Sequence, residues 1–318
     1  MARMLKVPLS IFVDSADELT IRFYGADGLV LPTGLQHKIE GILVRGELRR
    51  VPSPAAGRQI PIVGVRDLIA AEASGKYEKR TLQVAVHGNH PAAAATAAAL
   101  RMAGFSVPAQ PALYFDGLTV SVSRDGFHFS LADAAARFDC RASEAMVYLT
   151  AMLNKPGSTV ALPDDAPEAY EKMAAEHGTQ TVRCGRETDA AERYAAQTFS
   201  QSAVAEVVSL LCFLDARGIA PASLRAFLPE FATHSELLDC SCERGALMRR
   251  LAAERDACAE EGRNGVCFRF SGGVVRVQPS AARRALKIVA EGASEEIAKE
   301  LAVDVRTRAE RIGRENAD

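Results

Sequence analysis

Short stretches of alternating apolar and polar residues predict strands, and longer stretches with helical spacing predict the helices between them. Alternation at 9–13 and again at 19–23, on either side of the polar run Asp14–Asp17, predicts a β-hairpin. Residues 33–45 and 65–74 are expected to form helices. Residues 81–107 read as strand, helix and strand, because Pro91 suits a first helical turn and Gly104 a helix end.

The middle of the chain repeats this pattern. Alternation over 112–130 around Arg124-Asp125-Gly126 predicts a second hairpin, since Asp-Gly tolerates positive φ. A helix is expected from Ser143 to Leu153, and 158–184 form another strand–helix–strand unit. Asp165, three residues before Glu168, predicts a capping box for its helix. Residues 201–217 are apolar on nearly all sides, which predicts a buried helix.

The last part of the chain mixes strands and helices. Strands are expected at 237–241, 265–270, 274–278 and 286–289, and helices at 246–258 and 294–311. Ser294 is the expected cap of the final helix, with Glu295 and Glu296 at its positive end.

Composition narrows the function classes. A net charge of -2 gives no long-range field for nucleic acid or an anionic membrane, and no apolar run is long enough for a membrane span. The first residues do not form a secretory signal. Seven scattered cysteines suit a reducing compartment, so a cytoplasmic protein is expected.

Several segments, in their order along the chain, resemble the bacterial phosphohexomutases, most of all the mutase-like half of chains that also carry a sugar-nucleotide transferase. The segments are Ile21–Gly28, Val84–Val107, Leu118–Gly126, Phe199–Asp215, Cys240–Leu251 and Val275–Gly292. The resemblance implies an α/β fold, with tandem α/β/α layers like the second and third mutase domains and a C-terminal α+β domain like the fourth. The implied boundaries are a first-domain remnant at 1–78, then domains at 79–156, 157–232 and 233–318.

The same resemblance implies two site regions. Asp116 and Gly117 stand where the family carries an Asp-x-Asp-Gly-Asp-Arg metal loop, so Asp116 is the candidate Mg²⁺ ligand. Arg276 matches the arginine of the phosphate-binding motif, although Gln278-Pro279 replace its Ser-Asn/Gly pair. Ser280, Arg283 and Arg284 complete the candidate phosphate site. From the residues alone, Asp116 also reads as a turn residue, and Arg276 as an exposed strand residue.

The departures from the family decide the expected function. Tyr114–Val120 offers one carboxylate, which would hold Mg²⁺ weakly, so no cofactor is expected. The phosphoserine region and the sugar-recognition loop have no counterpart, so no catalytic residue is assigned. Phosphoryl transfer needs charge neutralisation and alignment, which this chain lacks. The expectation is an impaired phosphohexomutase-like protein that binds a sugar phosphate or has a regulatory or scaffold role in carbohydrate metabolism.

Two alternatives remain open at this stage. The chain could be an active mutase, alone or with a partner chain that supplies the first domain. It could also be part of a longer product.

Two smaller clusters carry weaker hypotheses. His87 and His90 flank a glycine turn at a strand end, where a metal site would need a third ligand. Cys240 and Cys242 alternate on an expected strand, and a zinc site would need two further ligands, so a buried strand is the simpler interpretation.

Overall fold

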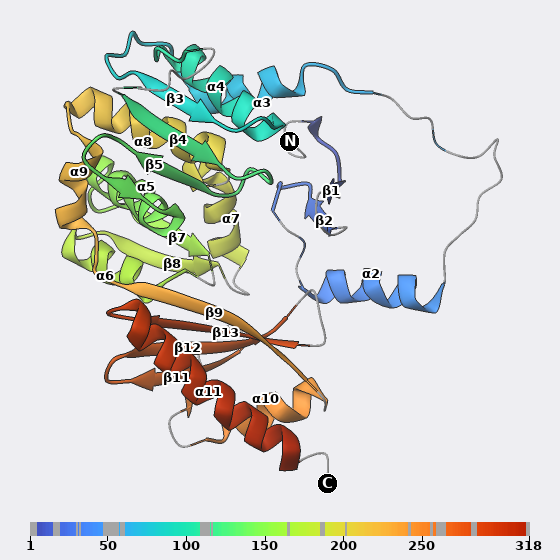
Figure 1. Ribbon diagram of the computed structural model, residues 1–318. Helices are drawn as coiled ribbons and strands as arrows, with labels where there is room; N and C mark the ends of the chain where they lie inside the picture. The colour runs from blue at the N-terminus through green and yellow to red at the C-terminus, as the bar shows by residue number, and fades with distance from the viewer. Residues whose placement is uncertain are drawn as a thin grey trace. The chain divides into compact units, whose positions relative to one another are not determined.

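The computed structural model describes most of the chain, grouped into two compact units. The described residues are 5–14, 20–29, 31, 33–46, 57, 61–108, 115, 117–163, 166–184, 188–200, 202–240, 243–254, 257–258, 265–280 and 285–315. Unit 1 comprises Met1–Asn154 and Ala195–Ala226, and unit 2 comprises Lys155–Tyr194 and Phe227–Asp318. Figure 1 labels the helices and strands of each unit.

Unit 1 is built on a four-stranded sheet of order β3-β4-β5-β6. The strands are β3 (Val84–His87), β4 (Leu118–Val122), β5 (Phe129–Ala132) and β6 (Arg137–Phe138). β3 and β4 are parallel, and the helix α4 (Pro91–Ala103) lies between them in the chain. Gly104 ends α4 with φ 101, and a Cβ there would lie 1.8 Å from the carbonyl oxygen of Glu78, so only glycine fits. This confirms the predicted strand, helix and glycine stop.

The helix α8 (Ala203–Arg217) forms the core of unit 1. It packs against α3 (Val65–Ser74), α4 and α5 (Cys140–Asn154). Its residues Val207, Leu210, Leu211 and Leu214 are fully buried, as the all-round apolar pattern predicts. The sequence places 195–226 in the third domain, whereas these residues pack with unit 1.

A separate two-stranded sheet belongs to unit 1 as well. β1 (Leu9–Asp14) pairs antiparallel with β2 (Thr20–Gly25), which agrees with the predicted hairpin. Arg22 donates a hydrogen bond to the Asp125 carboxylate at 3.1 Å, and Tyr24 stacks on Phe127 with ring centroids 6.2 Å apart. These two contacts join the β1–β2 hairpin to the turn between β4 and β5. The helix α2 (Thr33–Arg45) follows. The two short helices α9 (Pro221–Leu224) and η2 (Thr198–Ser200) complete the unit.

Unit 2 begins with a parallel strand pair. β7 (Thr159–Pro163) and β8 (Gln180–Cys184) are joined by α6 (Glu168–Glu176). The predicted Asp165 cap lies outside the described residues. Because α6 begins at Glu168 itself, the capping box that would place Glu168 in the third helical position is wrong. The helix α7 (Thr188–Ala196), which the sequence pattern did not indicate, follows β8, and the short η3 (Arg225–Phe227) precedes the next strand.

A five-stranded antiparallel sheet forms the rest of unit 2, in the order β10-β11-β12-β13-β9. Its strands are β9 (Ala232–Asp239), β10 (Ala257–Cys258), β11 (Val266–Phe270), β12 (Gly273–Pro279) and β13 (Ala285–Gly292). The helices α10 (Arg244–Ala252) and α11 (Glu295–Glu315) pack on it, around the buried side chains Phe268, Ile288 and Val305. The predicted helix to Cys258 is too long, because Ala257–Cys258 pair with β11 instead.

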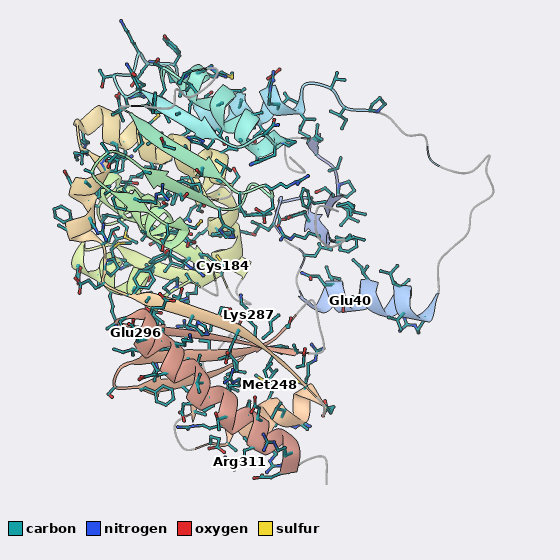
Figure 2. The ribbon with its side chains drawn as sticks, viewed as in Figure 1. Glu40, Cys184, Met248, Lys287, Glu296 and Arg311 are labelled. Atoms are coloured by element: carbon teal, nitrogen blue, oxygen red, sulfur yellow. The ribbon has the colours of Figure 1, made fainter. Side chains whose placement is uncertain are left out.

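The final helix agrees with its sequence signals. The Ser294 hydroxyl accepts a hydrogen bond from the Ile297 N–H at 3.3 Å, which confirms the predicted cap. Glu296 lies near the start of α11 and Arg311 toward its end, an arrangement that complements the helix dipole (Figure 2). The mixed α/β class is therefore confirmed, and the four-domain division remains a prediction.

Candidate functional site

The β12–β13 connection is the candidate phosphate-binding region of unit 2. Ser280 is 8% exposed, and its N–H donates to the Ala285 carbonyl at 2.9 Å, which closes the connection at its base. Arg244, the first residue of α10, donates from Nη1 to the Ser280 carbonyl at 2.9 Å. Arg283 and Arg284 lie outside the described residues, so their part in the site remains a prediction. The described residues thus fix the chain at Ser280 and Ala285, on either side of the two arginines in the sequence.

Arg276 has a different environment from either of its sequence interpretations. It lies within β12 and is 6% exposed, so the exposed-strand interpretation is wrong. Its guanidinium Nη2 lies 3.0 Å from Glu168 Oε1, and Arg269 Nη2 lies 2.9 Å from the same oxygen. The carboxylate of Glu168 therefore balances the charge of Arg276, and the phosphate-binding role of Arg276 stays a prediction.

The candidate metal ligand is the least defined of the predicted residues. Asp116 falls outside the described residues, and its assignment stays a prediction. Its neighbour Gly117 needs to be glycine, because a Cβ would lie 2.5 Å from the Phe115 ring and 2.8 Å from the Gln83 carbonyl oxygen. Across the described part of the chain, no three His, Cys, Asp or Glu side chains gather in a metal-binding group. For the same residues, no helix is long and apolar enough to span a membrane.

His90 serves as a helix cap. Its Nδ1 accepts from the Ala93 N–H at 3.3 Å, so the proton resides on Nε2, which lies 3.1 Å from the Val122 carbonyl oxygen. His90 thus ties the start of α4 to the end of β4. Gly88 has φ 130, and a Cβ there would lie 2.7 Å from His90 Nε2, so the turn accepts only glycine.

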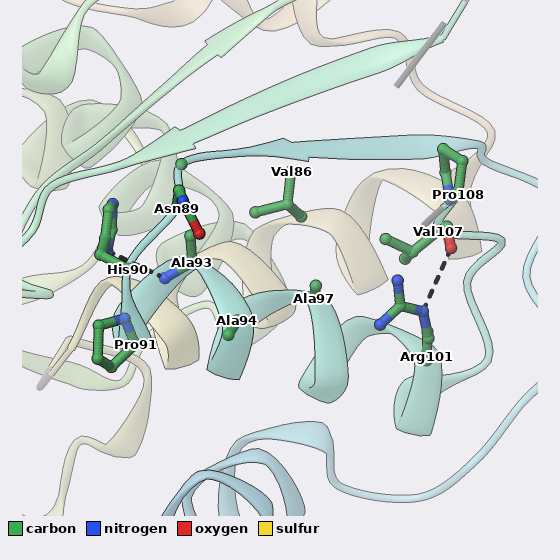
Figure 3. Close-up of a pocket in the computed structure, with 11 residues that line it drawn as sticks. Val86, Asn89, His90, Pro91, Ala93, Ala94, Ala97, Arg101, Val107 and Pro108 are labelled. Atoms are coloured by element: carbon green, nitrogen blue, oxygen red, sulfur yellow. Dashed lines mark hydrogen bonds between the residues drawn. The ribbon is translucent and has the colours of Figure 1, made fainter. Parts of the chain in front are cut away.

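A surface pocket of about 450 Å³ lies beside this turn (Figure 3). It runs from Gly88 and Asn89 along α4 to Arg101, where Val107 and Pro108 also line it (Figure 3). The sequence identifies the turn as a site where ligands bind in open sheets, but it gives no indication of the pocket. The pocket depends on small side chains on one helix face, which the alanine-rich sequence does not single out.

Two helix N-termini in unit 2 are filled by carboxylates of the protein. The Glu291 carboxylate accepts from the N–H groups of Glu168 and Ala169 at 2.7 and 2.8 Å. At α10, the Glu243 carboxylate accepts from Gly245 and Ala246 at 3.2 and 2.9 Å. Free helix N-termini bind anions, so these two are already satisfied and favour no external phosphate.

The sequence alone does not indicate the roles that Glu168, Glu291 and Arg244 have in the structure. Each acts on a partner far along the chain, with separations of 108 residues for Glu168–Arg276 and 36 for Arg244–Ser280. Local patterns carry no signal for such pairs. The Glu243 cap was detectable, since it immediately precedes the helix it caps.

Known structures share the fold. A phosphoglucomutase/phosphomannomutase family protein from Burkholderia thailandensis matches with a TM-score of 0.67 and 12% sequence identity, over 96% of this chain and 76% of that one. A putative phosphomannomutase from Thermus thermophilus matches with a TM-score of 0.61 and 13% identity, over 97% and 80%. No protein-family model matches the sequence, and no curated protein matches it significantly. The chain therefore has the fold of the phosphoglucomutase/phosphomannomutase proteins.

Proposed function

We propose that this chain is a phosphohexomutase-like protein that binds a sugar phosphate without isomerising it. Its role would be regulatory or scaffolding, in cytoplasmic carbohydrate metabolism. The observation that carries the proposal is the fold shared with the Burkholderia and Thermus proteins, whose names describe phosphosugar mutases, over nearly the whole of this chain.

The β12–β13 connection supplies the binding chemistry. Arg283 and Arg284 follow soon after Ser280, whose N–H and carbonyl are both held by hydrogen bonds. Two adjacent guanidinium groups give the charge and the paired donors that a phosphate requires.

The loss of catalysis follows from charge. Phosphoryl transfer spreads negative charge over the transferred oxygens, and a phosphohexomutase balances it with a metal ion. The segment Tyr114–Val120 contributes one carboxylate, Asp116, where the Asp-x-Asp-Gly-Asp-Arg loop of the family has three, so it would hold a magnesium ion weakly. In unit 2, Arg276 forms an ion pair with Glu168, although the family resemblance assigns this arginine to phosphate binding.

Titration calorimetry tests binding. Mannose 1-phosphate and glucose 1-phosphate are titrated with and without Mg²⁺ into the full chain and into the Arg283→Ala/Arg284→Ala variant. We expect binding independent of Mg²⁺ and at least about tenfold weaker in the variant, since each charged hydrogen bond contributes about 1.5–3 kcal/mol. Arg314→Ala is the matched control, because its side chain is 82% exposed in α11. Equal affinity for all three proteins would refute the loop assignment.

A coupled mutase assay with glucose 1,6-bisphosphate tests the absence of catalysis. We expect no turnover by the purified chain. Turnover that Asp116→Ala abolishes would establish the alternative, an active intramolecular phosphotransferase with Asp116 on its metal. Turnover that appears only when a second purified chain is added would show that a partner completes the site.

A further inference from the structure

The pocket beside α4 has the dimensions of a small-molecule site. Its volume of about 450 Å³ falls in the lower part of the range of about 300–1,000 Å³ typical of ligand pockets. The floor is formed by Ala93, Ala94 and Ala97, whose methyl groups leave space that larger side chains would fill. Val86 of β3 faces these alanines, and Val107 and Pro108 lie at the Arg101 end of the pocket (Figure 3).

The end of the pocket at Gly88 and Asn89 is neutral and is held by local contacts. The Gly88 turn and the His90 cap fix the backbone there. Because His90 already accepts from Ala93, the start of α4 offers little to an anion. Asn89 provides a side-chain amide, which can donate to or accept from a hydroxyl group (Figure 3).

The other end of the pocket is cationic. Arg101 donates from Nε to the Val107 carbonyl at 3.2 Å, which holds its guanidinium at the rim. The Nη groups remain available, and no carboxylate of the described chain forms an ion pair with Arg101. Asn89 and Arg101 lie at opposite ends of the pocket (Figure 3). The helix rises about 15 Å between Pro91 and Arg101, and the arginine side chain leans back along the helix, which shortens the gap.

We propose that this pocket binds a compact hydroxylated anion, such as a sugar acid or a phosphorylated polyol. The carboxylate or phosphate would pair with Arg101, a hydroxyl group would bond Asn89, and the C–H face of the molecule would lie on the alanine floor. This site is distinct from the β12–β13 loop, which lies in the other unit.

Saturation-transfer NMR and calorimetry with three probes test the proposal. D-gluconate and sorbitol 6-phosphate carry the two anionic groups on the same carbon skeleton, and sorbitol is the neutral control. The variants are Arg101→Met, which removes the charge and keeps an unbranched side chain, and Ala97→Leu, which fills the floor without changing charge. Arg124→Met is the matched control, since Arg124 is exposed on a hairpin turn outside the pocket.

We expect at least one anion to bind, and the one that binds identifies the preferred group. Arg101→Met should weaken binding at least about tenfold, Ala97→Leu should abolish it, and Arg124→Met should leave it unchanged. Binding of sorbitol as tight as that of the anions, or affinity unchanged in both pocket variants, would overturn the proposal. So would the absence of binding by either anion. Loss of binding in Arg283→Ala/Arg284→Ala alone would place the anion at the β12–β13 loop and refute the pocket, whereas its retention there separates this site from the proposed function.

Discussion

Replacing Glu206 with glutamine should stabilise the protein, and increasingly so as the pH rises. Glu206 lies in the first turn of α8 and is only 9% exposed. Burial, followed by the nearby charge of Glu144, raises the pKa of its carboxyl from 4.5 to about 8. Glutamine has nearly the same shape and no charge, so it removes the titration and keeps the packing.

The size of the effect follows from proton linkage. Well below pH 4.5 the carboxyl is protonated in both the folded and the unfolded chain, so its ionisation does not change the free energy of unfolding. Between pH 4.5 and about 8 the folded chain keeps the proton that the unfolded chain releases, so the free energy of unfolding falls as pH rises. At about 1.4 kcal/mol per pKa unit, and with titration incomplete at both ends, the loss between about pH 5 and about pH 7.5 is about 3 kcal/mol.

Urea unfolding followed by far-UV circular dichroism measures this loss, since the chain contains no tryptophan for fluorescence. We expect the stability difference between Glu206→Gln and wild type to grow by about 3 kcal/mol over that pH interval. Glu144→Gln should reduce the pH dependence in part, and Glu192→Gln, at an exposed position of α7, should not change it. A difference that stays constant from acid to alkaline pH would refute the reasoning.

Three further substitutions test contacts that hold each unit together. Glu291→Ala should cost about 2 kcal/mol, because it leaves two N–H groups at the start of α6 without their acceptor. Arg276→Met should cost about 2 kcal/mol by leaving the part-buried carboxylate of Glu168 with only the exposed Arg269 as its partner, and adding Glu168→Gln should recover part of that loss in a double-mutant cycle. Asp215→Ala should cost about 2 kcal/mol, because Oδ1 accepts from Thr81 N, Thr81 Oγ1 and Leu82 N at 2.8, 2.7 and 3.0 Å.

Urea midpoints measure all three losses, with Glu192→Ala as an exposed carboxylate control. Burial opposes ionisation of Asp215, but the hydrogen bonds from Thr81 and Leu82 outweigh it and lower its pKa. The contribution of Asp215 should therefore be present at neutral pH and lost as pH falls below its ordinary value of 3.8. Additive losses in the Arg276–Glu168 cycle, or an Asp215→Ala effect that persists in acid, would contradict these assignments.

Local sequence determined most of the individual elements of this protein. Proline and glycine at the two ends of α4, the Asp125-Gly126 turn and the Ser294 cap act within a few residues, so their effects can be read directly from the chain. The apolar surround of α8 likewise predicted burial. The sequence pattern could not predict which elements pack around α8, because apolar contacts are not specific for one partner.

Tertiary structure decided which partners the charged side chains have. Arg276 reads as a phosphate ligand or an exposed strand residue, and becomes a buried ion-pair partner only because α6 brings Glu168 to it across 108 residues. The start of α6 is capped by Glu291, 123 residues away, and not by a local capping box. The pocket beside α4 is formed where β3 and residues Val107 and Pro108 pack beside a row of alanines (Figure 3). Long-range pairing and empty space depend on how distant segments meet, and no local spacing of residues specifies that.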